Sequence, residues 1–349
     1  MKSSILQYLL NFQHFLVDAI CLACIMGTVS SQFDMEQEQQ VIALTMLIAL
    51  YNTLAFCTQW TTGLCCDILQ NDKPVHVVYT VLILFGAVAC RSTPVAGIIL
   101  IGIGNSLFHV VGGRHIIRHH GAKAAPLGMF VAPGAFGVYF GMTFSCWLWL
   151  FCMMLLLNSI AILRLQKGEE SPAMPVATRD SRPHGHTGIR TAVVIMVLVC
   201  IICRAASGSV PLAGSEFTEP WLWVPVAFVF WGKSLGGFWG DRFGIGLAGT
   251  LALLGGTLCL AFGGNEISFL IGQFLMNLLM PLTLYLLAQT LPNYPGLAFG
   301  AAASVLFPGS LIRLTWNPHR VLMILSAGSI LCFGASWLLF QRSQQRNRP

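Results

Sequence analysis

One apolar stretch of the chain ends in Gly232-Lys233-Ser234-Leu235-Gly236-Gly237-Phe238-Trp239-Gly240-Asp241-Arg242-Phe243-Gly244, with a glycine four residues before an aspartate. An earlier apolar stretch ends in the same way, in Gly63-Leu64-Cys65-Cys66-Asp67. A glycine lets neighbouring membrane helices approach closely, and an aspartate can pair with the end of an adjacent helix. The two copies lie in opposite halves of the chain, so they indicate a weak internal repeat.

The composition predicts that the surface around these segments faces lipid. Of the 349 residues, 56% are hydrophobic and only 9% are charged, whereas soluble domains carry about 25% charged residues. So few charges cannot cover the surface of one or two water-soluble domains. We therefore interpret the chain as a polytopic membrane protein, and we attribute its net charge of +6 to membrane topology, with no nucleic-acid partner.

Apolar stretches long enough to cross about 30 Å of hydrocarbon predict an all-α protein with about twelve transmembrane helices. We place these spans at 5–28, 41–60, 77–93, 94–113, 123–142, 144–164, 189–208, 220–240, 244–263, 266–290, 296–315 and 319–340. The longest polar stretch, 165–188, divides them six and six. The predicted domains are an N-terminal six-helix bundle at 1–164, a linker at 165–188, and a C-terminal bundle with a short tail at 189–349.

Basic residues predict the orientation, because loops on the cytoplasmic side carry an excess of lysine and arginine. With both termini and the linker in the cytoplasm, that side holds Lys2, Lys73, Arg114, Arg118, Lys123, Arg164, Lys167, Arg179, Arg182, Arg190, Arg242, Arg342, Arg346 and Arg348. The opposite side is poor in basic residues. We therefore expect both termini to be cytoplasmic.

The chain resembles the major facilitator superfamily of secondary transporters through its two six-helix halves, its cytoplasmic central loop and its two Gly-x-x-x-Asp segments. The best match is 232–244; the N-terminal copy departs from the family pattern, because 68–73 lacks the usual basic run. The resemblance implies two pseudo-symmetric bundles in the major facilitator fold.

The stretch 128–137, rich in glycine and proline, is similar to the helix-five motif of proton-driven antiporters. Two further segments, His14 with Asp18 and the stretch 102–109 that ends in Phe108-His109, are similar to the fosmidomycin-resistance-like branch of exporters, although Val110 stands where that branch usually has proline. This resemblance implies export across a bacterial cytoplasmic (inner) membrane.

His14 and Asp18 are the first candidates for a functional site. A spacing of four places both side chains on one helix face, about 6 Å apart, and a charge at bilayer depth costs at least about 2.5 kcal/mol unless something there uses it. Asp18 suits a proton-coupling carboxylate, and His14 can be its partner or relay the proton. The alternative is a structural pair that fixes the first helix to a neighbour.

The other candidates are polar or charged residues within or beside the spans. Arg204, in the seventh span, can bind an anionic substrate group or neutralise Asp18 from the opposite half. Further expected substrate-binding residues are His109, Asn105, Asn277, Gln273 and Tyr285, and the expected gating residues are Asp67, Lys233, Asp241 and Arg242.

No metal, cofactor or catalytic residue is expected. His115 and His119 have a spacing that can hold a metal on a helix, but the neighbouring Arg114 and Arg118 repel a cation. We interpret this segment as a solvated cytoplasmic loop.

These observations predict a proton-coupled secondary transporter that moves a small organic solute by alternating access, acts as an exporter and works as a monomer. One alternative is a transporter-like sensor or scaffold without turnover. Another is an intramembrane enzyme built on Ser106 and His109, although a serine and a histidine three residues apart lack the nucleophile elbow and oxyanion donors of such enzymes.

Overall fold

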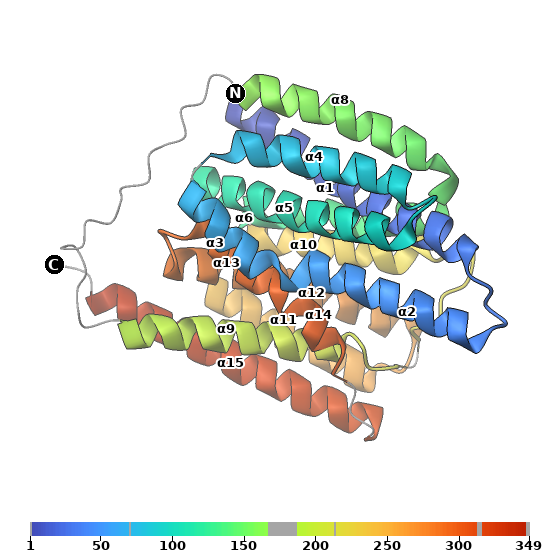
Figure 1. The fold of residues 1–349 in the computed structure, drawn as a ribbon. Helices are drawn as coiled ribbons and strands as arrows, with labels where there is room; N and C mark the ends of the chain where they lie inside the picture. The colour runs from blue at the N-terminus through green and yellow to red at the C-terminus, as the bar shows by residue number, and fades with distance from the viewer. Residues whose placement is uncertain (1, 70, 167–186, 213, 313–315, 347–349) are drawn as a thin grey trace.

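The computed structural model describes residues 2–69, 71–166, 187–212, 214–312 and 316–346, and these form a bundle of long helices (Figure 1). Ten helices of the described residues are long and apolar enough to cross a membrane. The chain is therefore an integral membrane protein. We call the end of the bundle at which α1 (Lys2–Ala23) begins and α15 (Pro318–Arg346) ends the terminal end; it is the end predicted to be cytoplasmic.

The N-terminal half runs through six membrane segments, several of which are interrupted. They comprise α1 (Lys2–Ala23) with η1 (Cys24–Val29) and η2 (Ser30–Gln32), α2 (Glu38–Asn52) with η3 (Thr53–Cys57) and α3 (Gln59–Leu69), α4 (Asp72–Ala89), α5 (Pro94–His120), α6 (Ala125–Val131) with α7 (Pro133–Thr143), and η4 (Ser145–Trp147) with α8 (Leu148–Gln166). The fifth segment divides at Pro133 because proline has no N–H to continue the helical hydrogen bonds.

The C-terminal half repeats this arrangement. Its helices are α9 (Thr187–Ser207), α10 (Trp223–Phe243), α11 (Ile245–Phe262), α12 (Glu266–Thr290), α13 (Pro295–Ser304), α14 (Leu306–Ser310) and α15 (Pro318–Arg346). The predicted linker at 165–188 lies, apart from its ends, outside the described residues.

Two of the twelve predicted spans are absent from the ten strongly apolar helices, for different reasons. The segment α10 carries Lys233, Asp241 and Arg242, which lower its hydropathy. The eleventh span breaks at Val305 into α13 and α14, each too short to cross a bilayer alone. Both nevertheless lie within the helical bundle (Figure 1).

Two predicted helix ends differ most from the structure. The second segment was expected to end at residue 60 but continues to Leu69, and the fourth was expected to end at residue 113 but continues to His120. The prediction of a solvated loop at 114–120 was therefore wrong. The reason is that Arg114 is completely buried and forms ion pairs with aspartates of the neighbouring segments, so a basic residue that resembles a loop residue lies inside the bundle.

Two of the contacts between the halves bring helix backbones close together at the terminal end. The helix α3 packs on α13, and α6 packs on α10. Glycines bring the backbones together: a Cβ atom on Gly63 would collide with the backbone of Gly296, and one on Gly237 would collide with the backbone at Ala124 and Ala125. Small residues thus produce close contact between the halves at this end.

Candidate functional site

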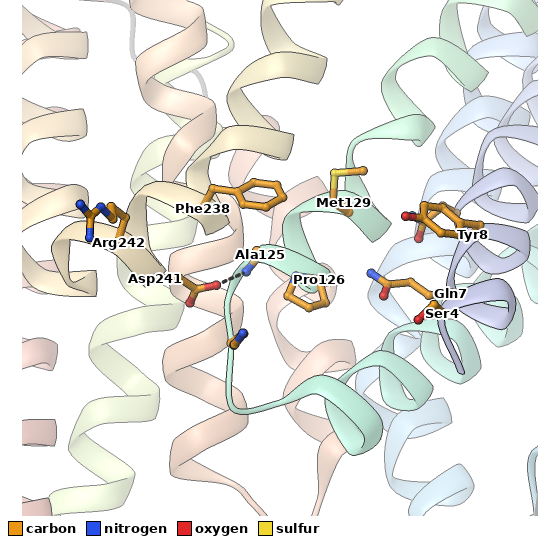
Figure 2. Close-up of a pocket in the computed structure, with 11 residues that line it drawn as sticks. Ser4, Gln7, Tyr8, Ala125, Pro126, Met129, Phe238, Asp241 and Arg242 are labelled. Carbon is orange, nitrogen blue, oxygen red and sulfur yellow. Dashed lines mark hydrogen bonds between the residues drawn. The ribbon is translucent and has the colours of Figure 1, made fainter. Parts of the chain in front are cut away.

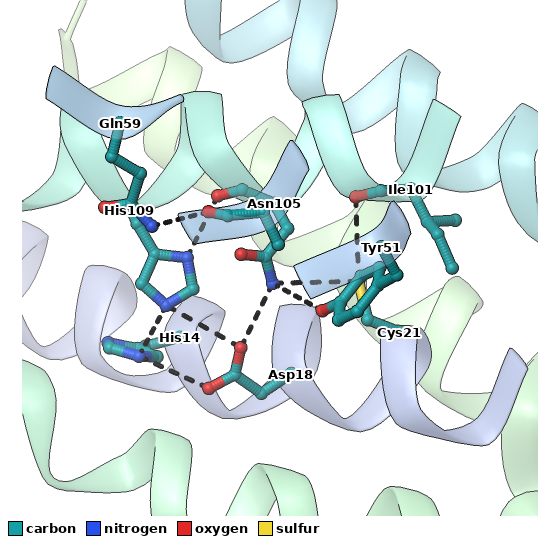
Figure 3. A network of polar contacts seen from close by, with 9 residues as sticks. His14, Asp18, Cys21, Tyr51, Gln59, Ile101, Asn105 and His109 are labelled. Carbon is teal, nitrogen blue, oxygen red and sulfur yellow. Dashed lines mark hydrogen bonds and ion pairs between the residues drawn. The ribbon is translucent and has the colours of Figure 1, made fainter. Parts of the chain in front are cut away.

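Three titratable side chains converge in the middle of the N-terminal half. His14 and Asp18 come from α1, and His109 comes from the neighbouring helix α5 (Figure 3). The Nε2 atom of His14 lies 3.4 Å from Oδ2 of Asp18, the Nε2 atom of His109 lies 3.6 Å from Oδ1, and the two Nε2 atoms are 2.9 Å apart. The predicted pair on α1 is therefore a triad that spans two helices.

Polar groups of the same half hold the triad in place. The Nδ2 amide of Asn105 donates to Oδ1 of Asp18 at 3.2 Å and to the hydroxyl of Tyr51 at 3.2 Å. The Nδ1 atom of His109 lies 2.9 Å from the carbonyl oxygen of Asn105. A carbonyl can only accept, so Nδ1 of His109 carries the proton and its Nε2 lone pair points at His14 and Asp18.

A glycine on the fifth segment makes room for the triad. A Cβ atom on Gly134 would lie 2.5 Å from Oδ2 of Asp18 and 2.6 Å from Nε2 of His14. Gly137, one turn later, lies against the backbone of Phe15. The glycine-rich stretch 128–137, which carried part of the resemblance, therefore allows α7 to pack directly on the triad face of α1.

The triad is largely buried, with Asp18 its most accessible member. The side chain of Asp18 is 13% exposed, compared with 6% for His14 and 8% for His109. Lys233 of α10, in the opposite half, interacts electrostatically with Asp18 and with Arg204. The carboxylate thus faces the C-terminal half rather than lipid.

Arg204 does not neutralise Asp18, which was one of its two predicted roles. The ion-pair partners of Asp18 among the described residues are His14 and His109, both from its own half. Arg204 lines a small cavity within the C-terminal half, together with residues of α12, α13 and α14 such as Met280, Phe299 and Leu306. It is turned inward, so its other predicted role, recognition of an anionic group, stays a prediction.

The remaining predicted substrate-binding residues are spread along α12. Asn277 is buried and donates to the carbonyl of Gln273 within its own helix, and Gln273 is half-buried. Tyr285 is close enough to Asp241 to interact electrostatically, which places it near the terminal end. Of these predicted residues, His109 therefore belongs to the triad and Asn105 contacts it, whereas Asn277, Gln273 and Tyr285 lie elsewhere on α12.

Two aspartates, which we call the latch residues, join the halves at the terminal end. The carboxylate of Asp67 accepts hydrogen bonds from the backbone N–H groups of Gly296 and Leu297 at the start of α13, each at 2.9 Å. The carboxylate of Asp241 accepts from the backbone N–H groups of Ala124 and Ala125 at the start of α6, at 2.8 and 2.9 Å; Figure 2 shows the contact with Ala125. The two contacts repeat each other across the halves, as the two Gly-x-x-x-Asp segments do in sequence.

Each latch residue sits where a carboxylate is favoured. The first N–H groups of a helix have no partner within it and carry partial positive charge. Asp67 is buried and Asp241 is exposed. Arg242, also predicted to act in gating, extends away from Ala125 (Figure 2).

Asp67 has a second environment that Asp241 lacks. The Nε atom of Arg114 lies 3.4 Å from its Oδ1, and NH1 of Arg114 lies 3.0 Å from Oδ1 of Asp72. Arg114 also donates to the carbonyl of Cys66. This completely buried guanidinium therefore ties α5 to the ends of α3 and α4.

Sequence reasoning missed a second polar cluster, which joins α1, α4 and α8. Gln13 donates to Ser159 at 2.7 Å and to Tyr79 at 3.3 Å, and Asn158 donates to Gln13. The hydroxyl of Tyr79 lies 2.8 Å from a ring nitrogen of His76. The group is well supplied with partners, which is typical of structural hydrogen bonding between membrane helices.

The serine and histidine of the enzyme alternative do not form a pair. The hydroxyl of Ser106 contacts the hydroxyls of Thr58 at 2.9 Å and Thr62 at 3.2 Å. The ring nitrogens of His109 face Asn105, His14 and Asp18 instead. A histidine base beside the serine is thus missing from this arrangement.

Comparison with solved structures shows that the chain has the fold of the major facilitator superfamily, with about twelve transmembrane helices in two pseudo-symmetric six-helix bundles. One similar structure is FucP, described as a major facilitator superfamily transporter in the outward conformation, with a TM-score of 0.68 and 12% identity. Another is a single-residue variant of the E. coli fucose:proton symporter FucP, with a TM-score of 0.67 and 10% identity. Both alignments cover 100% of each chain. No protein-family model and no curated protein matches the chain.

Proposed function

We propose that the chain is a proton-coupled secondary active transporter that moves a small organic solute by alternating access. The observation that carries this proposal is the triad, a carboxylate held between two histidines and facing the opposite half of a major facilitator fold. Intramembrane ionisable residues are expensive and mark ion pathways in transporters. Asp18 is the proton-coupling group in this proposal, and His14 and His109 share its proton.

The latch residues supply the conformational part of the mechanism. Both latches close the terminal end, by contacts between one half and the first backbone N–H groups of a helix of the other. To open the terminal end, the protein must break both latch contacts. Opening the opposite end of the bundle leaves both contacts intact. We assign Asp67 and Asp241 to gating; comparable roles for Lys233 and Arg242 stay predictions.

The direction of transport is the open part of the proposal. The resemblance to the fosmidomycin-resistance-like branch favours export, and the similar structures give this branch no support, since one of them is described as a fucose:proton symporter. A bacterial inner-membrane location, cytoplasmic termini and a monomeric state belong to the same set of predictions.

The test is a proton-flux assay on the full chain in liposomes, with solutes first selected by a growth screen of expressing and non-expressing cells. We expect a selected solute to drive proton movement through the wild type and through Asp34→Asn, and not through Asp18→Asn. Asp34 is the matched control, since it is exposed and lies between η2 and α2, outside the triad.

The sign of the flux separates the two directions, because symport moves solute and proton together and antiport moves them in opposite directions. A wild type that moves neither solute nor protons would refute the proposal. Solute binding without flux would favour the sensor alternative instead.

A further inference from the structure

We propose that His14, Asp18 and His109 form a binding site for one divalent transition-metal ion of the Zn²⁺, Co²⁺ or Ni²⁺ class. The inference rests on the proposed function, because these are the side chains to which that function assigns proton coupling. It departs from the sequence-based expectation that the chain has no metal site.

The geometry of the three donor atoms carries the inference. Each of the three residues offers one atom, and these atoms all lie within 4.8 Å of one another. Nitrogen and oxygen ligands about 2.0 to 2.1 Å from a tetrahedral Zn²⁺ are about 3.3 Å apart. The two Nε2 atoms are 2.9 Å apart, and the carboxylate of Asp18 approaches both of them, with Oδ2 at 3.4 Å from His14 and Oδ1 at 3.6 Å from His109. The two nitrogens and one of these oxygens therefore lie close to the spacing of one face of such a tetrahedron.

The surrounding hydrogen bonds prepare the ligands. The Nδ1 proton of His109 is held by the carbonyl of Asn105, which leaves Nε2 with a free lone pair. The amide of Asn105 holds Oδ1 of Asp18. Histidine ligands of metals usually donate their second N–H to a carbonyl or carboxylate in this manner. One residue, Asn105, thus orients two of the three ligands.

Metal binding requires a change in the protonation of His14. Because Nε2 of His109 is unprotonated, the proton between the two rings belongs to Nε2 of His14 in the ion-free state. Metal binding requires that proton to move to Nδ1 or to leave. The Nδ1 atom of His14 is buried without a partner, so no existing hydrogen bond is broken there.

The chemistry of the donors selects the class of ion. Two imidazoles and one carboxylate suit Zn²⁺, Co²⁺ and Ni²⁺, whereas Mg²⁺ and Ca²⁺ prefer oxygen ligands alone. Three protein ligands leave a fourth position open, as in sites that exchange a ligand. The positive charge of Lys233, which interacts with Asp18 and His109 from the other half, favours reversible rather than very tight binding.

Metal and protons compete for the same atoms, because all three ligands must be deprotonated to bind an ion. Binding therefore releases protons in proportion to the protonated fraction of the triad. A bound ion excludes the proton from Asp18.

The experiment is a Co²⁺ titration of the purified full chain in detergent, followed by visible absorption. We expect one tetrahedral Co²⁺ per chain, displaced by Zn²⁺, with an affinity at least about 30-fold lower in His14→Ala and in Asp18→Asn. Changes beyond the ligands typically cost 10- to 100-fold, so Asn105→Ala should weaken binding about 10-fold. Gly134→Ala, which keeps every ligand but puts a methyl group against Asp18 and His14, should also lose the ion.

The matched control is His119→Ala, because His119 lies on the same helix as His109 but pairs with His115, with the ring centroids 4.2 Å apart. Three results would overturn the proposal: no binding by the wild type, binding that persists in His14→Ala and Asp18→Asn, or an absorption band that shows thiolate ligands. The titration needs no gradient. Proton-coupled flux without Co²⁺ binding would refute the metal site alone, and Co²⁺ binding without flux would refute the transport function alone.

Discussion

Removal of one latch residue should loosen the other latch, although the two are far apart in sequence. In Asp241→Ala, the N–H groups of Ala124 and Ala125 lose acceptors at 2.8 and 2.9 Å. A hydrogen bond of this kind contributes about 1 kcal/mol and a carboxylate at a helix start about 0.3 to 1 kcal/mol. Two hydrogen bonds and one favourable charge add up to somewhat more than about 2 kcal/mol. Because Asp241 is exposed, we take about 2 kcal/mol as the free energy that the whole contact contributes.

A loss of about 2 kcal/mol corresponds to about a 30-fold change in an equilibrium constant. If the halves separate as units, the closed state loses this much relative to the open state. The N–H groups of Gly296 and Leu297, which Asp67 still holds, should then exchange with deuterated water about 30-fold faster.

The assay is hydrogen–deuterium exchange with mass spectrometry on a peptide that covers the start of α13. Asp34→Ala is the control, since it removes an exposed aspartate that lies outside both latches. Faster exchange confined to Ala124 and Ala125 would refute the reasoning, because the two contacts would then open independently. Equal acceleration in Asp34→Ala would refute it as well.

Three further predictions follow from the packing. Gly134→Ala should abolish proton-coupled flux, because its methyl group would lie 2.5 Å from Oδ2 of Asp18. Flux should be unchanged in the control Gly334→Ala, because a Cβ atom at that position would meet nothing within 4 Å. Asp67→Ala should lower the free energy of unfolding by about 3 kcal/mol, since it leaves a buried guanidinium with fewer partners; thermal unfolding measured beside Asp34→Ala checks this, and equal midpoints would contradict it. Gln13→Ala should destabilise the fold by about 1 to 3 kcal/mol, because Ser159 and Asn158 lose their partner in a buried setting, and it should leave the sign and solute dependence of flux intact; a reversed or altered coupling would show that this cluster belongs to the transport site.

The fold could be predicted from the sequence because a chain surrounded by lipid can adopt few kinds of structure. Hydropathy and length located the segments, and the two Gly-x-x-x-Asp copies indicated the two halves. The prediction of a solvated loop at 114–120 failed because charged residues were taken to indicate exposure to water. Arg114 is completely buried, but its partners Asp67 and Asp72 come from other segments, and no spacing along α5 reveals them.

The candidate site could be predicted in part. The spacing of His14 and Asp18 placed both on one face of α1, but His109 joins them only through the rotation of α5 against α1, which a single sequence does not encode in any local pattern. Neutralisation of Asp18 was one of the two roles expected of Arg204, yet Asp18 is already supplied with partners by its own half. The cluster around Gln13 was missed because uncharged polar residues give a weak signal in an apolar segment.

The latches have a consequence for how the chain tolerates change. In each of them one partner is a side chain and the other is the peptide backbone at residues 124–125 or 296–297. Every amino acid except proline supplies the same N–H, so substitutions at those four positions leave the donors in place, while almost any substitution at the two aspartates removes the acceptor. On the backbone side the limit is therefore space and not hydrogen bonding: a Cβ atom on Gly296 would lie 2.6 Å from the backbone oxygen of Gly63, whereas Leu297 is half-buried. A mutational scan should find both aspartates sharply intolerant, and on the backbone side of the Asp67 contact it should find Gly296 intolerant for steric reasons and Leu297 permissive.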